Sequence, residues 1–482
     1  MAYRWDALHT ADNIIRTNID RNPFEAIPEY LIGLVTQHLT VKEALGISEV
    51  SKQWYEKTAN SGSFVKRIKV SAKCIGGKSN TVCGSVHEDI IRKSSLIARS
   101  LRQYSTLEVG LCEQCNNNMN PLYNDFNQEW THVSFIESHF HSISQLVSCI
   151  AMMQYSLETL VIRDVSMSVT TMVLQQWTFT RLTTLKLVNF PSQLLIFCFA
   201  DVVTLREFHI QSEEQSEQSL NALIQIFIRN SELKTLSISG LFLIWLMTRF
   251  REQELVGTFE FKLREIVVNF PSLHQCKVSC DTIGALMKSQ RDSLEVVEFG
   301  QFMGFYVLCA AYDLPNLKGL TLKGAVPNDY LAEWKNFKLN VNESIQHLQI
   351  HNTPNACKVN YTHTLMAAAP NITSFFINWL DDTMILHITV ANPKIRQIFV
   401  EFSTVTDETI MNFDLIPNVQ SLCINNSNLS SLELIHQMND ATRSNFQRHF
   451  YKLFVARFLA FKDVEAMKGH PVHIEMSRML KL

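Results

Sequence analysis

A six-residue motif recurs through most of this chain and limits the folds that the chain can adopt. The motif has apolar residues at its first, fourth and sixth positions, as in Leu182–Leu187 and Leu317–Leu322. After a first interval of 39 residues, successive copies follow at steps of 23 to 31 residues. The fourteen copies begin at Val65, Tyr104, Trp130, Leu157, Leu182, Leu205, Leu233, Leu263, Leu294, Leu317, Ile345, Ile372, Ile395 and Val419, and Phe450–Val455 is a candidate fifteenth. Self-similarity at this period is typical of solenoids, in which each repeat packs on its neighbours.

Each copy indicates a short strand that is followed by a helix. Alternation places Leu185 and Leu187 on one side of a strand and Lys186 on the other. Apolar residues at helical spacing then follow in the intervening stretches, for example from Leu220 to Phe227. Because strand–helix–strand crossovers are right-handed, they give parallel strands. The spacing resembles the leucine-rich repeat. We therefore expect an α/β leucine-rich-repeat solenoid, a curved horseshoe with parallel strands on its concave face, over residues 64–456, with a C-terminal cap or tail over residues 457–482.

The ninth residue of each repeat, with the first motif residue counted as one, departs from the leucine-rich-repeat pattern. A typical repeat carries Asn or Cys there, and that side chain bonds the backbone of the loop. In this chain only Cys112 fits, and the position is otherwise held by Val165, Phe190, Glu213, Leu241, Ala325, Thr353 and Ser427. The backbone of the turn after each strand must therefore be satisfied in another way. We expect irregular loops and uneven curvature.

The N-terminal stretch from Ile27 to Trp54 has a different pattern. Its apolar residues predict two or three short amphipathic helices, and a unit of about thirty to forty residues is too small to fold without a covering partner. The stretch resembles the F-box at Ile27, Pro28, Leu31, Val35, Leu39, Val50 and Trp54. It departs from that family at Tyr30, Thr36 and Ala44. The resemblance implies a small all-α F-box over residues 25–63, after a lead-in over residues 1–24, whose seven matching residues bind an adaptor. The alternative is a helical cap on the repeats that follow.

The bulk composition excludes several classes of partner. The net charge is −3, from 43 basic and 46 acidic residues, so we expect neither nucleic-acid nor membrane binding. The N-terminus carries no secretory signal, and the longest apolar runs fall short of the roughly 20 residues that span a bilayer. Eleven scattered cysteines indicate thiols in a reducing compartment. We therefore expect a cytoplasmic or nuclear protein.

No motif indicates catalysis, a cofactor or a metal ion. The chain lacks a phosphate-binding glycine loop and a nucleophile elbow. Cys112 and Cys115 form a single Cys-x-x-Cys pair, and the second pair that a structural zinc site requires is absent. We expect Cys112 in a turn, Cys149 on a core helix face, and His139 and His141 at the surface or at the entry of a helix. The expected role is therefore non-catalytic.

The residues between the core positions of each strand form the face on which a partner would bind. Reading the fifth motif position along the array gives mostly polar residues until Phe376 and Phe399, which we expect to be lateral neighbours. Exposed aromatic residues are enriched in protein recognition sites. The predicted substrate-binding residues are His347, Gln349, His351, Phe376, Trp379, Phe399 and Phe402. Two alternatives stay open: the C-terminal tail from Ala456 to Leu482 covers the aromatics, or a register shift of one residue turns them into core.

An F-box followed by leucine-rich repeats resembles the substrate receptors of Skp-cullin-F-box ubiquitin ligases. That resemblance implies a Skp-type adaptor as direct partner, cullin and RING subunits bound through it, and a protein substrate of unknown identity on the repeats. The substrate would be ubiquitinated and degraded, although this chain would carry no catalytic residue. The alternative is a leucine-rich-repeat scaffold that binds a protein and has no ubiquitin-ligase role.

Overall fold

A computed structural model describes the parts of the chain that carry most of the repeats. The described residues are 31, 35, 39, 43, 69–74, 104–117, 129–169, 179–212, 216–252, 260–269, 280–300, 304–324, 337–351, 358–382, 384, 388, 392–403, 421–425 and 452–456. The chain divides into two compact units, Met1–Glu232 and Leu233–Leu482. Each unit is described by itself.

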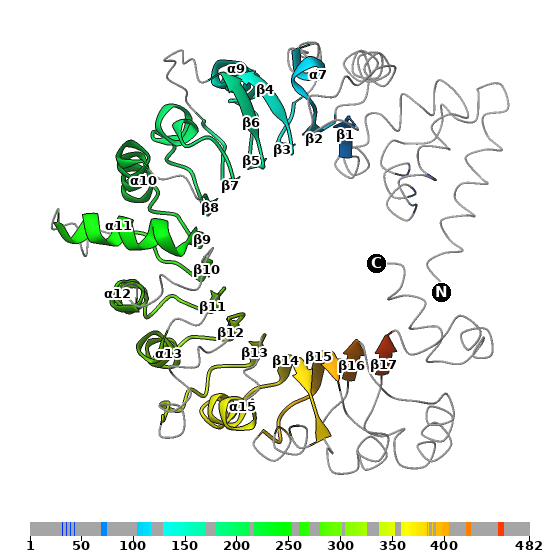
Figure 1. The fold of residues 1–482 in the computed structure, drawn as a ribbon, viewed down its shortest axis with the longest axis vertical. Coiled ribbons are helices and arrows are strands. Elements are labelled where there is room, and N and C mark those ends of the chain that lie inside the picture. The colour runs from blue at the N-terminus through cyan, green and yellow to red at the C-terminus, as the bar shows by residue number, and fades with distance from the viewer. Residues whose placement is uncertain are drawn as a thin grey trace. The chain divides into compact units, whose positions relative to one another are not determined.

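Unit 1 contains a parallel sheet and a smaller second sheet (Figure 1). The main sheet has the order β1 (Lys69–Lys73), β2 (Thr106–Gly110), β3 (His132–Ile136), β5 (Thr159–Arg163), β7 (Thr184–Val188) and β8 (Glu207–Gln211). The second sheet pairs β4 (His139–Ser142) with β6 (Ser166–Val169). The helices are α7 (Glu113–Asn117), α9 (Ile143–Ala151), the π-helix η1 (Leu195–Phe199) and α10 (Glu217–Arg229).

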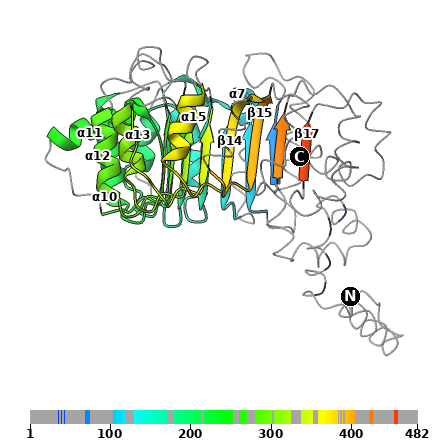
Figure 2. The ribbon, with the colours of Figure 1, turned by 90° about the horizontal axis from the view of Figure 1, so that it is seen from below.

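Unit 2 shows the same alternation of strands and helices, and its strands also pair in parallel (Figure 2). Its strands are β9 (Thr235–Ser239), β10 (Glu265–Asn269), β11 (Val296–Phe299), β12 (Gly319–Leu322), β13 (His347–Ile350), β14 (Ser374–Leu380), β15 (Gln397–Ser403), β16 (Ser421–Asn425) and β17 (Lys452–Ala456). Its helices are α11 (Gly240–Glu252), α12 (Cys280–Ser289), α13 (Phe305–Tyr312) and α15 (Lys358–Ala367). In both units the helices lie on one side of the strands (Figure 1). This is the predicted α/β solenoid of leucine-rich-repeat type.

The motif residues build the core of each repeat. In β7 the side chains of Leu185 and Leu187 are fully buried, and Lys186 between them is partly exposed. Leu182, at the first motif position, is also fully buried. Helix α10 begins after Ser216, which caps its N-terminus by accepting a hydrogen bond from the Ser219 N–H at 3.1 Å. Its buried residues are Ser219, Leu220, Ala222, Leu223, Ile224, Ile226 and Phe227.

The predicted register is confirmed from the second motif copy onward. Within each unit, residues at the fifth motif position are lateral partners, for example Lys186 with His209 and Phe376 with Phe399. The candidate fifteenth copy forms β17, which pairs in parallel with β16. The first copy was placed wrongly by two residues, because Ser71 rather than Lys69 pairs with Glu108. A shift of two residues keeps the alternation of side chains, so periodicity alone does not detect it.

The turns after three strands use left-handed backbone in place of a bonded Asn or Cys. Glu137, Asp164 and Asn189 follow β3, β5 and β7 with φ angles of 51°, 53° and 46°. Each of these residues donates its backbone N–H to a carbonyl oxygen at the end of the next strand, at 2.9 Å. The Asn189 side chain also donates to the Asp164 carboxylate at 2.8 Å. The expectation that these turns are satisfied in another way is therefore confirmed where the structure describes them.

Buried asparagines link consecutive repeats at the other end of the strands. The Asn230 side chain accepts a hydrogen bond from the Leu205 N–H at 2.7 Å, and it donates to the Val202 carbonyl at 2.8 Å. Asn342 and Asn392 make similar contacts to carbonyl groups of the preceding repeat. All three lie three residues before the start of a motif copy. These side chains satisfy backbone groups where a helix returns to the sheet.

Candidate protein-binding surface

The open face of each sheet is the side that carries the fifth motif positions, opposite the helices. In unit 1 this face carries a cluster of charged side chains at β1 and β2. The Glu108 side chain is 8% exposed and forms ion pairs with Lys69 and with Lys73, the latter at 2.5 Å. Hydrogen bonds from Lys69 and then Lys73 hold the pKa of the Glu108 carboxyl below its usual range. This ion-pair network joins β1 to β2.

At β7 and β8, unit 1 places a histidine beside a lysine. His209 and Lys186 are register partners on the open face. Burial and, to a smaller extent, the Lys186 charge together lower the pKa of His209 to about 4, whereas the Glu207 carboxylate opposes the shift. The imidazole is therefore neutral at physiological pH, and Lys186 carries the local positive charge.

The open face of unit 2 changes from charged to aromatic along the sheet. Lys323 pairs with Glu298 at 2.5 Å at the end of β11 and β12. The next strands carry no charged side chain at the fifth position, where Gln349, Phe376 and Phe399 are register partners on β13, β14 and β15. We define the β13–β15 patch as His347, Gln349, His351, Phe376 and Phe399.

The β13–β15 patch is an open surface and not part of the core. Phe376 and Phe399 are partly exposed, whereas their strand neighbours Phe375 and Ile398 are fully buried. A register shift of one residue is thereby excluded. The His351 ring packs against Phe376 with ring centroids 4.5 Å apart and an interplanar angle of 33°. The tail over residues 457–482 lies outside the described residues, so its relation to the patch stays untested.

Of the other two predicted aromatics, Trp379 lies on the opposite side of its strand from Phe376, and the side chain of Phe402 lies outside the described residues. Trp379 pairs in register with Phe402 near the ends of β14 and β15. Alternation along β14 places Trp379 on the same side as Phe375 and Ile377, away from Phe376. The prediction included Trp379 in the binding surface, although it lies three positions after Phe376 and an odd step along a strand reverses the side.

Four of the seven predicted adaptor-binding residues lie outside the described residues. Leu31 and Val35 are helical, Leu39 lies in a bend, and Val35 is 49% exposed. The remaining positions, Ile27, Pro28, Val50 and Trp54, are not described. Their role stays a prediction.

A polar cluster that the sequence did not indicate surrounds helix α7. The Glu113 carboxylate contacts His141 Nδ1 at 2.7 Å, Ser168 Oγ at 2.5 Å and His139 Nε2 at 3.3 Å. His139 also bonds the Ser166 hydroxyl at 2.8 Å through Nδ1. The hydrogen bond from Ser168, followed by that from His141, holds the pKa of Glu113 below its usual range. His141 is exposed and His139 is partly exposed, and both lie on the strand that enters helix α9, as predicted. Their pairing depends on β4 and β6, which lie outside the repeat motif.

Comparison with known proteins identifies no family. No model of a known protein family matches the chain, and no curated protein matches it. Among the helices that the structure describes, none has the length and apolar character needed to cross a membrane.

Solved structures with partial similarity include three from different organisms. A chain of the mouse RP105/MD-1 complex is 10% identical with a TM-score of 0.34, and the match covers 78% of this chain and 60% of that one. An internalin from Listeria monocytogenes is 11% identical with a TM-score of 0.32, covering 77% and 95% of the two chains. A leucine-rich-repeat protein from Leptospira interrogans is 12% identical with a TM-score of 0.29, covering 86% and 96%. The chain thus spans less than two thirds of the mouse protein, and the fold assignment rests on the strand order and register described above.

Proposed function

We propose that the β13–β15 patch is a protein-binding surface. The observation that carries this proposal is the register pair of partly exposed phenylalanines on neighbouring strands of unit 2. Phenylalanine rings on an open sheet face leave apolar area in water, and a protein partner that covers them gains free energy from its burial. Gln349, His347 and His351 flank the rings with hydrogen-bonding groups. A central apolar contact with a polar rim is the usual anatomy of a protein interface.

At a finer level, we propose that the chain is the substrate receptor of a Skp-cullin-F-box ubiquitin ligase. The support is the spacing of Ile27, Leu31, Val35 and Trp54 and its place before a repeat array. Residues 25–63 would bind a Skp-type adaptor, and the repeats would hold a protein substrate. The chain would act without catalytic residues, by raising the effective concentration of the substrate near a conjugating enzyme that the other subunits hold. The cytoplasm and the nucleus are the expected compartments.

The patch is tested with neighbouring phenylalanines that point in opposite directions. The Phe376→Ala and Phe399→Ala double variant should lose at least about tenfold in the recovery of specific partners by affinity capture and quantitative mass spectrometry. Its melting temperature should stay within a few degrees of wild type. The matched control Phe375→Ala removes a fully buried ring from the same strand and should cost about 3–5 kcal/mol of folding free energy.

Two outcomes would contradict the patch proposal. The double variant could retain every partner, in which case the aromatic rings do not contribute to binding. Alternatively, Phe399→Ala could lower the melting temperature by several degrees while partner binding remains intact, in which case Phe399 acts as core. Lys394→Ala, an exposed change before β15, controls for nonspecific loss of capture.

The ligase role is separated from a scaffold role by one binding experiment. Purified full-length chain should bind a Skp-type adaptor, and the Leu31→Ala and Trp54→Ala double variant should weaken that binding by at least about tenfold. The phenylalanine variant above should bind the adaptor as wild type does. If the wild-type chain does not bind the adaptor, the chain is a protein-binding scaffold and its N-terminal helices serve another purpose, such as capping the repeats.

A further inference from the structure

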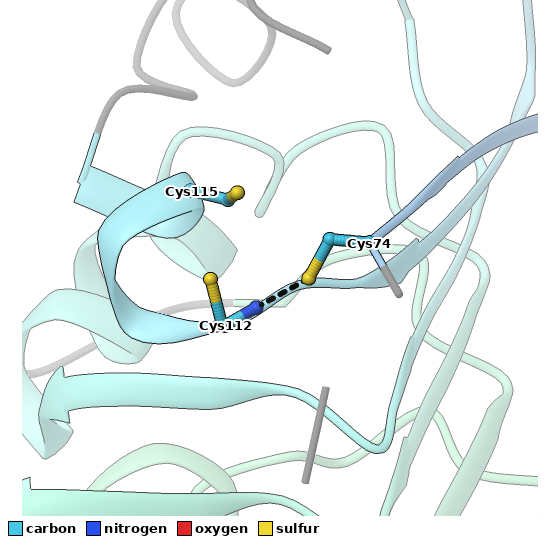
Figure 3. A group of neighbouring side chains, drawn as sticks. All are labelled: Cys74, Cys112 and Cys115. Carbon is cyan, nitrogen blue, oxygen red and sulfur yellow. Dashed lines mark hydrogen bonds between the residues drawn. The ribbon is translucent and has the colours of Figure 1, made fainter. Parts of the chain in front are cut away.

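Three cysteine side chains from two consecutive repeats converge in unit 1 (Figure 3). Cys74 directly follows β1, Cys112 lies two residues after β2, and Cys115 lies in helix α7. Their sulfur atoms all lie within 4.8 Å of one another. The Cys-x-x-Cys pair that was visible in the sequence therefore has a third sulfur, which is supplied by a residue 38 positions before Cys112.

The protein backbone holds these three positions in place. The Cys74 N–H donates to the Gly110 carbonyl at 2.9 Å, which fixes the end of β1 beside the end of β2. The Cys112 N–H donates to the Cys74 sulfur at 3.0 Å. The Asn116 side chain donates to the carbonyl groups of Leu111 and His139, at 3.2 Å and 2.7 Å. Helix α7 is thus anchored on one side to β1 and on the other to β4.

The surroundings of the three sulfurs favour a bound ion over simple apolar packing. Cys115 is fully buried and Cys112 is 9% exposed, whereas Cys74 is partly exposed and leaves a side from which an ion can enter. A backbone N–H that points at a sulfur stabilises its thiolate form. Tetrahedral zinc with Zn–S bonds of about 2.3 Å places its sulfur ligands about 3.8 Å apart. The sulfurs need to approach one another by no more than about 1 Å to reach that geometry.

We propose that Cys74, Cys112 and Cys115 form a three-thiolate site for a thiophilic metal ion, with Zn²⁺ as the expected occupant. On binding, each thiol loses its proton, so that three Zn–S bonds form and three protons pass to solvent. No fourth Cys, His, Asp or Glu among the described residues joins the group. The fourth tetrahedral position is therefore assigned to water or to an added ligand. The ion would tie the end of β1 to helix α7 of the next repeat and stabilise that end of the sheet.

The other buried cysteines of unit 1 provide internal controls. Burial raises the pKa of Cys149 and of Cys198 to about 12, so each stays a protonated thiol. Neither belongs to a group of three metal-ligating side chains in the described part of the chain. Cys149→Ser and Cys198→Ser should therefore leave metal binding unchanged within about twofold, although they alter core packing.

The test uses the full-length protein, stripped of metal and reduced before titration with Zn²⁺. We expect one tightly bound Zn²⁺ per chain that Cys74→Ser, Cys112→Ser and Cys115→Ser each weaken by at least about tenfold. Co²⁺ in the same site should give the absorption bands of tetrahedral thiolate coordination. Because a serine variant could fail to fold, thiol alkylation of the wild-type protein provides a second measurement. Bound Zn²⁺ should protect Cys74, Cys112 and Cys115 from alkylation and leave the labelling of Cys149 and Cys198 unchanged.

Three results would overturn the site. The reduced wild-type protein could take up no stoichiometric Zn²⁺. Zn²⁺ could protect a different set of cysteines, which would place the ion elsewhere in the chain. Peptide mapping without reductant could find a disulfide between two of the three cysteines in protein that was alkylated at cell lysis, which would assign the cluster to oxidation and not to metal binding.

Discussion

At the scale of single residues, the neutral imidazole of His209 links folding to pH. Its pKa of about 4 lies below the value of 6.5 expected in an unfolded chain. As the pH falls below 6.5, the unfolded state takes up the proton first, so stability is lost progressively between pH 6.5 and pH 4. His209→Gln removes this titration. The stability that wild type loses between pH 7 and pH 5 should therefore shrink by about 1–2 kcal/mol in the variant.

Urea unfolding of both proteins at pH 7 and pH 5 measures this difference. Carboxylates titrate equally in wild type and variant, so comparing the two proteins isolates the histidine. Equal losses in both would show that His209 is protonated as easily in the folded chain as in the unfolded one.

Asn230 is the residue whose hydrogen bonds connect one repeat to the next. It is fully buried and bonds the Leu205 N–H together with the carbonyl groups of Val202 and Ile226. Asn230→Ala leaves these backbone groups unpaired in the core and should cost about 2–4 kcal/mol of unfolding free energy. The control Asn316→Ala removes one exposed hydrogen bond to the Asp292 carbonyl and should cost less than about 1 kcal/mol. Chemical denaturation gives both values, and similar costs would rule out a special role for Asn230.

At the scale of elements, two glycines beside β11 and β12 differ in the space that surrounds their Cα atoms. A Cβ atom at Gly300 would lie 2.6 Å from Asn269 Oδ1 and 3.1 Å from Asn269 Cα, at the end of β10. At Gly319 the nearest atoms are two Val296 side-chain carbons at 3.7 Å, which is ordinary contact. Gly300→Ala should therefore destabilise the protein by about 1–3 kcal/mol. Gly319→Ala should be neutral or stabilise by up to about 1 kcal/mol, because the unfolded chain loses freedom. Thermal unfolding ranks the two variants, and the reverse order would contradict the packing at Gly300.

The strands could be predicted from the sequence because their core positions repeat with a fixed period. Leu185 and Leu187 are buried as alternation predicted, and Phe376 pairs with Phe399 because both hold the fifth position of consecutive motif copies. The first copy failed because alternation has a period of two, so Ser71 and Lys69 satisfy it equally. The Asn230 type of contact was missed for a different reason. In the sequence this contact shows only as one polar residue three positions before a motif copy, and a search for repeated apolar residues does not detect a polar one.

At the scale of the whole molecule, the two candidate sites differ in how much of each could be predicted from the sequence. The β13–β15 patch follows from register arithmetic alone, because neighbouring strands belong to consecutive copies of the motif. The cysteine cluster does not. Cys74 lies outside any motif position, and only the packing of β1 beside β2 brings its sulfur to the Cys112 turn. Contacts between the loops of successive repeats depend on loop conformation, and a repeating apolar pattern carries no information about that conformation.

The modular character of repeat arrays predicts that these two sites act independently. Each repeat contacts only its neighbours, so a change in unit 1 should not reach a surface in unit 2. Cys115→Ser should abolish tight Zn²⁺ binding and leave partner capture unchanged, whereas Phe376→Ala should do the reverse. In the double variant each loss should equal that of the corresponding single variant within about 0.5 kcal/mol.

The adjacent pair Phe376 and Phe399 is the contrasting case. These side chains share a surface, so their single changes should not add when partner binding is measured. Titration calorimetry with Zn²⁺ and quantitative capture of the partner supply both free energies for the full set of variants. Coupling above about 1 kcal/mol between Cys115 and Phe376 would mean that the array transmits structural change along its length, and that metal binding in unit 1 regulates recognition in unit 2.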